Sequence, residues 1–317
     1  MESHRKWEAG RGSPAQQLKT AESRFWDHYG LEPVEHLVEI NDPTCRLRIQ
    51  EVGSGVPVLF IHGTGGSGAY FAPLLEELTG YRCMALDRPG WGGSDPVEYP
   101  DLGYGAFIAG LLAQLLDALD IGQVHVIGAS IGNTWALRLA TEHPDRVASV
   151  ALLGGAPLVP EIQVPRFIKL LRSPLGHVIS RVRFTGKMET NQSRGLGHGP
   201  SLDDGRMPDA FVNWKVEMSN TTEWRKHERD MVRSIVGRHG WKPGLTFTPT
   251  ELSAITVPVL MLFGTEDPVG SPETWRTFTD YIPNSELTLI QDAGHLLWFD
   301  QTDQVALQLT NHLAQIT

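Results

Sequence analysis

A serine between two glycines is the first residue of this 317-residue chain whose type and setting could do chemistry. Ser130 lies in Gly128-Ala-Ser-Ile-Gly132, after the apolar run 124–127 and before a helical pattern. This is the G-x-S-x-G pattern of a nucleophile elbow in the strand–turn–helix context that the elbow requires. The glycines let strand and helix pass closely around a strained turn. The pattern predicts that Ser130 is a nucleophile presented at the top of a sheet.

A serine hydroxyl needs a base that takes its proton and an acid that orients the base. Asp267 and His295 each follow a strand-like run late in the chain, in the order Ser, acid, His. Glu266 and Asp292 are the nearest alternative acids. Because doubly wound sheets gather functional groups at the carboxyl ends of their strands, we expect Ser130, His295 and Asp267 to form a triad.

The other histidines are assigned to structural or surface positions. His62 precedes a glycine-rich loop, where we expect it to form hydrogen bonds that shape the turn, and His125 lies in a strand. The remaining histidines have polar or charged neighbours, and we expect them at the surface: His4, His28, His36, His143, His177, His198, His227, His239 and His312.

The glycine-rich loop after His62 has two interpretations. Gly63, Gly65 and Gly68 satisfy G-x-G-x-x-G, and Asp87 follows at the distance of a ribose-binding acid, as in a dinucleotide site. Free N–H groups at a strand-to-helix turn can equally stabilise the oxyanion of acyl transfer. The downstream elbow favours the oxyanion function, and Asp87 is then structural.

The elements that must position these residues alternate along the chain. Helical patterns follow Asp101 and Ser130. Alternating strands and helices predict an α/β fold with a doubly wound, mostly parallel, eight-stranded sheet. The expected strands are short apolar or β-rich runs: 34–40, 45–52, 56–61, 82–86, 124–127, 147–153, 257–263 and 287–290.

The alternation stops over about a hundred residues that contain several prolines and two helical stretches, 209–218 and 224–236. We interpret residues 155–255 as an inserted, mainly helical cap. The catalytic core then comprises 33–154 and 256–317. Residues 1–32 form an N-terminal arm, in which Phe25, Trp26 and Tyr29 could attach a short helix to the body.

Charge is divided unevenly between these parts. The net charge is −10, which argues against nucleic acid as a partner. Residues 155–250 carry +6 and the remainder −16. This contrast fits electrostatic attachment of the cap to the core, or a cap that offers a cation to an anionic small-molecule substrate.

Targeting signals are not evident in the sequence. No apolar run reaches the ~18 residues of a membrane span, and the N-terminus lacks the apolar core of a secretory signal. We expect a cytoplasmic protein without a membrane partner, as a monomer or homodimer. No metal-ligand spacing occurs, and no cofactor is expected.

Together these motifs resemble the α/β-hydrolase superfamily with a helical cap, over roughly residues 34–317. The matching motifs are H-G-T-G-G at 62–66, D-R-P-G-W-G-G-S-D at 87–95, G-A-S-I-G at 128–132, G-T-E-D at 264–267 and A-G-H at 293–295.

The resemblance implies that Ser130 is the nucleophile, His295 the general acid/base and Asp267 its orienting acid. It also implies an oxyanion hole formed by the N–H groups of Ile131 and Thr64, with Gly65 as the alternative to Thr64. A serine nucleophile argues against haloalkane dehalogenases and epoxide hydrolases, which have Asp there. Asn133 departs from the small residue that the family often has after the elbow.

The expected activity is two-step hydrolysis of a carboxylic ester, thioester or lactone of a small molecule through an acyl-enzyme, as in a carboxylesterase. One alternative is a carbon–carbon bond hydrolase acting on a diketone-type substrate. Another is a non-enzymatic small-molecule receptor on the same scaffold. Besides Gly65, apolar side chains could form a substrate pocket: Trp91, Met188, Met207, Trp214 and Met218.

Overall fold

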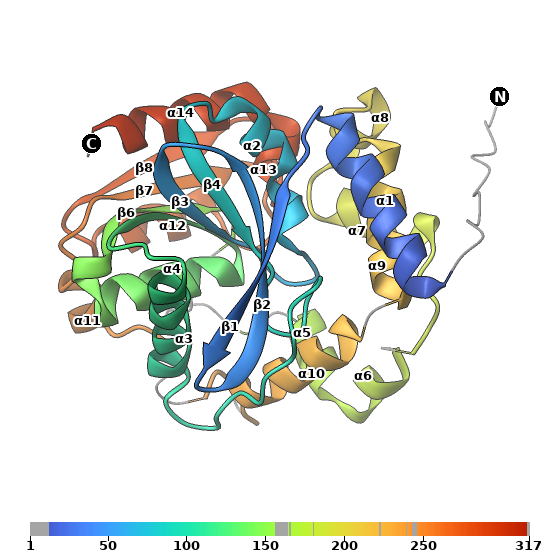
Figure 1. The fold of residues 1–317 in the computed structure, drawn as a ribbon, viewed down its shortest axis with the longest axis horizontal. Coiled ribbons are helices and arrows are strands. Elements are labelled where there is room, and N and C mark those ends of the chain that lie inside the picture. Colours follow the sequence, from blue (N-terminus) through green and yellow to red (C-terminus); the bar gives the residue numbers. More distant parts are fainter. Residues whose placement is uncertain are drawn as a thin grey trace.

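An eight-stranded sheet runs through the centre of the computed structural model (Figure 1). The strand order is β1-β2-β4-β3-β5-β6-β7-β8, and only β2 runs antiparallel to its neighbours. The predicted fold class is confirmed. The structure describes residues 13–155, 164, 166–179, 181–221, 223–238, 240–242 and 246–315. The strands are β1 (Val34–Asn41), β2 (Thr44–Gly53), β3 (Val56–Ile61), β4 (Tyr81–Leu86), β5 (Val124–Ala129), β6 (Val147–Leu153), β7 (Val259–Gly264) and β8 (Ser285–Ile290).

Strand burial follows position in the sheet. The strands β5 and β7, which both have a neighbour on each side, are buried at every residue, as strands covered on both faces should be. All eight predicted runs form strands, with small shifts at their ends. β7 begins at Val259 rather than residue 257, because Pro258 has no N–H for the ladder. β8 begins earlier than predicted, at Ser285, where the edge strand is only partly buried.

Helices cover both faces of the sheet, and each face buries its own hydrophobic cluster. One face carries α3 (Tyr104–Ala118), α4 (Ile131–Glu142) and α12 (Pro272–Thr279). The opposite face carries α2 (Ala72–Glu77), α13 (Leu297–Asp300) and α14 (Thr302–Ala314). Two short 3₁₀ helices, η1 (Gly68–Phe71) and η2 (Pro144–Arg146), precede α2 and β6.

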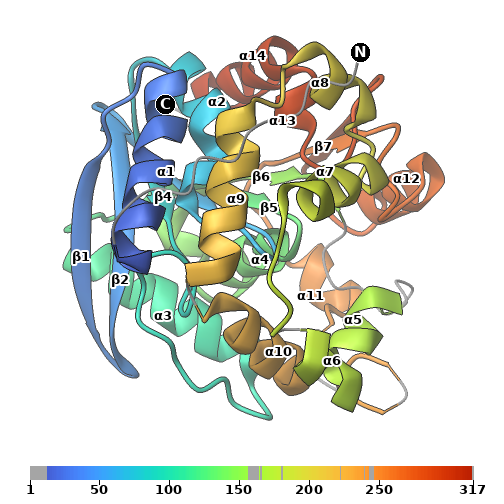
Figure 2. The same cartoon turned by 90° about the vertical axis from the view of Figure 1, so that its right-hand side faces the viewer.

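Between β6 and β7 the chain forms a series of helices, and we call residues 155–255 the cap (Figure 2). In the described part of this segment, the only β pairing is an isolated bridge between Val236 and Trp241. The boundaries at 155 and 255 stay a prediction. The helices are α5 (Arg166–Arg172), α6 (Pro174–Ile179), α7 (Gly186–Gly195), α8 (Gly199–Asp204), α9 (Asp209–Thr221), α10 (Trp224–Ile235) and α11 (Pro249–Ser253).

The N-terminal helix α1 (Pro14–His28) lies beside α9 in both views (Figures 1 and 2). It begins after Ser13, whose side chain accepts the N–H of Gln16. The Phe25 ring stacks on Trp214 of α9, with centroids 5.3 Å apart. Phe25 and Trp26 therefore attach α1 to the body through its buried face, in part against the cap. No helix in the described part of the chain combines the length and apolar character needed to cross a bilayer.

Candidate active site

Ser130 lies at the sharp turn between β5 and α4. Its φ of 55° and ψ of −122° place it in a strained conformation that non-glycine residues rarely adopt. The Ser130 N–H donates to the carbonyl oxygens of Leu153 and Gly154, both at 3.1 Å. A Cβ at Gly63 would lie only 2.8 Å from Cβ of Ser130, and one at Gly132 would overlap the end of the neighbouring strand β3. The glycines therefore leave the space in which this turn can form.

Asp267 and His295 come together from the loops that follow β7 and β8. Nδ1 of His295 lies 2.9 Å from Oδ2 and 3.1 Å from Oδ1 of Asp267. The carboxylate is fixed by two further donors, the N–H groups of Val269 and Gly155, each at 2.8 Å. A carboxylate can only accept, so the His295 proton lies on Nδ1 and Nε2 is left as the basic nitrogen.

The charges of this pair support each other. Burial alone would lower the pKa of His295, but the charge and hydrogen bond of Asp267 outweigh it and raise that pKa above 6.5. Burial would raise the pKa of Asp267, but His295 and the N–H groups of Val269 and Gly155 lower it below 3.8. Asp267 is therefore an anion at neutral pH and favours the cation that His295 would form on taking a proton.

Gly155 shows how close the nucleophile and the histidine lie. A Cβ at this glycine would be 2.6 Å from Cε1 of His295 and 3.3 Å from Oγ of Ser130. The structure thus brings all three predicted triad residues to one place. Asn133, which departs from the family pattern, is buried and donates from its amide to Gly154 and Gly155 at 3.0 and 3.2 Å. It holds the turn after β6 against the triad.

His62 and Arg88 hold the glycine-rich loop from the core side. Nε2 of His62 accepts the N–H of Arg88 at 3.0 Å, so Nδ1 carries the proton and donates to the carbonyl of Gly63 at 2.7 Å. Burial and the Arg88 charge lower the pKa of His62 well below 6.5, which keeps the ring neutral. The Arg88 guanidinium donates to the same Gly63 carbonyl at 3.0 Å. His62 therefore shapes the loop through hydrogen bonds.

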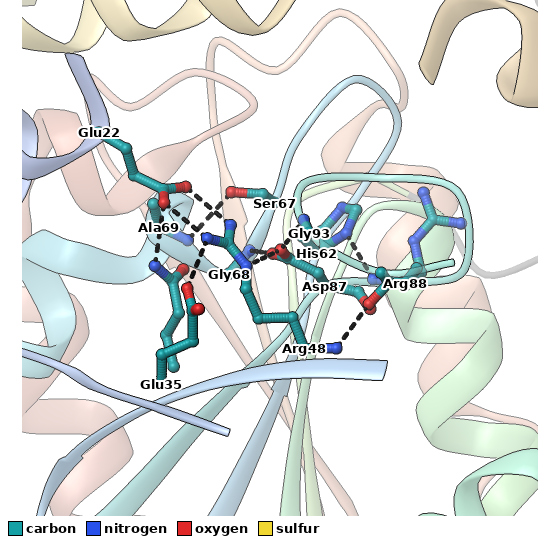
Figure 3. A network of polar contacts seen from close by, with 12 residues as sticks. Glu22, Glu35, Arg48, His62, Ser67, Gly68, Ala69, Asp87, Arg88 and Gly93 are labelled. Atoms are coloured by element: carbon teal, nitrogen blue, oxygen red, sulfur yellow. Dashed lines mark hydrogen bonds and ion pairs between the residues drawn. The ribbon is translucent and has the colours of Figure 1, made fainter. Parts of the chain in front are cut away.

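Asp87 anchors the far end of the loop (Figure 3). Its carboxylate accepts the N–H groups of Gly68 and Gly93, each at 2.7 Å, and Nε of Arg48 at 2.5 Å. With no exposed surface and these partners in place, Asp87 cannot reach a ribose. Arg48 also forms a two-point ion pair with Glu22 of α1 at 2.7 and 2.9 Å. The network therefore joins the N-terminal helix to the glycine-rich loop.

The cap places two buried charges against the predicted oxyanion loop. The Lys215 ammonium, on α9, donates to the carbonyl of Gly65 and lies 2.5 Å from the Tyr70 hydroxyl. The Glu228 carboxylate, on α10, faces the Thr64 hydroxyl and the Gly65 N–H. Neither of its oxygens reaches hydrogen-bond geometry with a described residue. Burial raises the pKa of Glu228, although Arg88, Thr64, Gly65 and Lys215 lower it.

The predicted pocket residues lie in the protein interior, except for Met188, which is 40% exposed. Trp91 is fully buried and packs under Arg88, whose guanidinium carbon is 4.4 Å from the ring centroid. Trp214 and Met218 are buried in the cluster that joins α9 to α1. None of the contacts described for these three side chains reaches Ser130 or His295, and their role in substrate binding stays a prediction.

The sequence did not indicate the burial of the polar cap residues that lie against the loops of the site, among them His198, Lys215 and Glu228. The expectation that His198 and His312 lie at the surface is wrong, since they are 0% and 7% exposed. Polar neighbours in sequence do not reveal what a helix end packs against. The one usable signal for His198 is the glycine directly before it, a feature that it shares with His295 in the A-G-H motif.

A family model described as the alpha/beta hydrolase fold matches residues 56–302. The 2-hydroxy-6-oxononadienedioate/2-hydroxy-6-oxononatrienedioate hydrolase of Cupriavidus pinatubonensis is 28% identical over 278 residues, which is 81% of this chain and 87% of that protein. A carboxylesterase of Bacillus subtilis is 18% identical, with a TM-score of 0.70 over 95% of this chain and 98% of the other. A meta-cleavage product hydrolase of Pseudomonas fluorescens is 19% identical, with a TM-score of 0.70 over 90% and 98%.

These comparisons correct the predicted activity. The coarse prediction of a hydrolase agrees with the family match and with the named relatives. The prediction of carboxylesterase-like activity is wrong, because curated relatives that match most of the chain are named as hydrolases of 2-hydroxy-6-oxo dienedioates. The two structures with equal TM-scores, one an esterase, show that the fold does not distinguish these activities.

Proposed function

Because the chain belongs to the alpha/beta hydrolase fold family, we propose that it uses Ser130, His295 and Asp267 to hydrolyse a carbon–carbon bond in a small anionic 2-hydroxy-6-oxo dienoate. The observation that carries the proposal is the similarity to dienedioate hydrolases over 81% and 84% of the chain. The geometry of the serine triad supplies the chemistry, and the acidic core makes a membrane or nucleic acid an unfavourable substrate.

The substrate class fixes which bond breaks. In 2-hydroxy-6-oxononadienedioate the only ketone is at carbon 6, so a nucleophile attacks there. Heterolysis of the C5–C6 bond leaves an electron pair on C5. This pair is stabilised if C5 is sp3-hybridised before cleavage and adjacent to a C=C bond that is conjugated to a carbonyl group. Moving the C2 enol proton to C5 produces that arrangement, because the C3=C4 bond then links C5 to a carbonyl at C2.

The triad residues then act in order. His295 takes the proton of Ser130 as Oγ attacks C6, and Asp267 stabilises the resulting imidazolium. The N–H groups of Thr64 and Ile131 would bind the oxyanion at C6, and Gly65 is the alternative donor. Collapse breaks the C5–C6 bond, and the His295 imidazolium gives its proton to the departing dienolate, which leaves as a five-carbon dienol acid and returns His295 to its neutral form. Water, deprotonated by His295, then frees the acyl group of carbons 6–9 as succinate, so one water is consumed overall.

Lys215 is the cap residue that we assign to a substrate carboxylate. It is a buried cation at the glycine-rich loop, and its ammonium has three N–H donors, of which Gly65 and Tyr70 occupy two. Burial lowers the pKa of Lys215, while Glu189 and Glu228 raise it. A carboxylate on the third donor would add a charge-assisted hydrogen bond.

The proposal is tested with purified protein and 2-hydroxy-6-oxononadienedioate. We expect loss of the conjugated chromophore with equimolar succinate and a five-carbon dienol acid. Ser130→Ala should lose roughly 10³-fold or more of the rate. Ser149→Ala is the control: it removes a buried hydroxyl that is hydrogen-bonded to His125, away from the triad, and should keep the wild-type rate. If the protein reacts with a fluorophosphonate but leaves the dienedioate intact, the proposed carbon–carbon cleavage is wrong. The assignment of the triad is not contradicted by that result.

A further inference from the structure

A second buried histidine–aspartate pair lies behind the catalytic histidine. His198 directly precedes α8 in the cap, and Asp300 is the last residue of α13 in the core. Their exposed fractions are 0% and 3%. Nδ1 of His198 lies 2.8 Å from Oδ2 of Asp300. No step of the proposed reaction uses either residue, although both are buried close to its base.

The pair binds the backbone on both sides of His295. The N–H of Gly294 donates to Oδ2 of Asp300 at 2.8 Å. The N–H of Leu296 donates to Nε2 of His198 at 3.0 Å. The two peptide groups that flank the catalytic residue are therefore held by two side chains that also bind each other.

The segment that carries His198 packs directly on the same loop. The N–H of His295 itself donates to the carbonyl oxygen of Leu196 at 2.9 Å. Gly197 has a φ of 94°, and a Cβ there would lie 2.8 Å from Cα of Gly294. A Cβ at Gly294 would overlap the Leu196 carbonyl. The two backbone segments are therefore in close contact, with no space for a side chain between them.

The hydrogen bonds also define the tautomer of His198. Because Nε2 accepts the Leu296 N–H, the ring proton lies on Nδ1 and is donated to Asp300. Asp300 is held in turn by the Ser201 hydroxyl, and its backbone carbonyl accepts from Arg206. Both ring nitrogens of His198 are thus occupied, so the imidazole acts on the reaction only through the backbone that it holds.

We propose that His198 and Asp300 are positioning residues, which orient the catalytic imidazole by fixing the peptide groups of residues 294–296. His198 belongs to the cap and Asp300 to the core. The packing of the cap segment on the loop therefore determines the orientation of the His295 imidazole. The inference rests on the proposed function only in taking His295 as the base for Ser130. It applies to whichever bond the triad attacks.

Four variants separate the contacts. His198→Leu removes both hydrogen bonds. His198→Asn can still donate to Asp300 from the position of Nδ1, but it cannot reach Leu296. His198→Gln can still accept from Leu296 near the position of Nε2. The matched control is His125→Leu, because His125 is also buried, at 2% exposure, and bonds Ser149 at 2.8 Å near the start of β5.

The readouts are the rate of fluorophosphonate labelling at Ser130 and the kcat and KM for 2-hydroxy-6-oxononadienedioate, each per folded chain. A displacement of about 1 Å costs on the order of 10²-fold in rate. We expect His198→Leu and His198→Asn to lose about 10- to 100-fold in labelling rate and in kcat, with KM within about 2-fold. His198→Gln should retain most of the labelling rate and most of kcat. The acid limb of the kcat profile should move to lower pH in the impaired variants, because a displaced His295 loses part of its bond to Asp267.

Two results would overturn the proposal. One is a folded His198→Leu that labels and turns over at the wild-type rate; if that variant does not fold, His198→Asn decides in the same way. The other is an equal loss in His125→Leu, which would reduce the effect to general destabilisation. A wild-type protein that labels but leaves the dienedioate intact contradicts the proposed substrate, while the labelling rates still judge the positioning role.

Discussion

Two buried histidine–aspartate pairs lie on either side of one short loop, and their pairing geometry is nearly the same. The Nδ1–Oδ2 distance is 2.9 Å for His295 and Asp267, and 2.8 Å for His198 and Asp300. They differ at the other ring nitrogen. Nε2 of His198 accepts a backbone N–H, whereas Nε2 of His295 bonds no described residue. The roles proposed here, a base for His295 and a support for His198, therefore depend on the environment of Nε2 rather than on the pair itself.

The largest expected difference between the pairs is at the histidines. His295→Ala removes the base and should lower kcat by roughly 10⁴-fold or more, because a triad serine without its base is not activated. His198→Ala should leave kcat within about 100-fold of wild type, since the base is still present. Steady-state kinetics on the dienedioate measure both. Equal losses would mean that the two histidines do not have different roles.

The next largest effect is expected at the catalytic acid. Asp267→Asn keeps the size of the side chain but can donate to Nδ1, which stabilises the wrong tautomer of His295 and removes the charge that supports its cation. Such a change costs on the order of 10⁴-fold in kcat. A loss below about 10-fold would assign the orienting role to another acid, of which Glu266 is the nearest in sequence.

Asp300→Asn is the matching change in the supporting pair. Its amide oxygen can accept only part of the bonds that the carboxylate accepts from His198, Gly294 and Ser201. We expect about 10-fold lower kcat and about 1–3 kcal/mol lower free energy of unfolding. Kinetics and chemical denaturation check the two effects. A kcat loss as large as that of Asp267→Asn would contradict the division of roles.

The smallest effect is a shift in pH dependence. His295 must be neutral to act as base, so activity falls as pH drops through its pKa. Because Asp267 raises that pKa above 6.5, the acid limb of kcat/KM should lie above this value. In Asp267→Asn the limb should move to lower pH, and in Asp300→Asn it should move less in the same direction. A limb that stays in place in Asp267→Asn would contradict the coupling.

The sequence predicted the sheet well, because its signals are local. A strand buried on both faces must be almost continuously apolar, as in β5 and β7, and every such run was found. The elbow around Ser130 was also recognisable, since close packing of strand and helix demands glycine at Gly128 and Gly132. The order of the loops after β7 and β8 then led to Asp267 and His295.

The cap contacts could not be predicted in this way, because they depend on tertiary packing. His198, Lys215 and Glu228 share no pattern of neighbours in the sequence, yet each is buried at the junction of cap and core. Likewise, Glu22 of α1 reaches the glycine-rich loop only through Arg48 and Asp87. The triad is common to ester and carbon–carbon hydrolases, so the motifs could not separate the two activities.

The central claim is that Ser130 carries out carbon–carbon cleavage, and titration with a fluorophosphonate tests it most directly. Protein labelled to increasing extents is assayed for cleavage of 2-hydroxy-6-oxononadienedioate, and the modified peptide is identified by mass spectrometry. We predict that activity falls in proportion to the labelled fraction and disappears at one label per chain, on Ser130. Protein that is fully labelled at Ser130 and still cleaves the dienedioate would contradict the account.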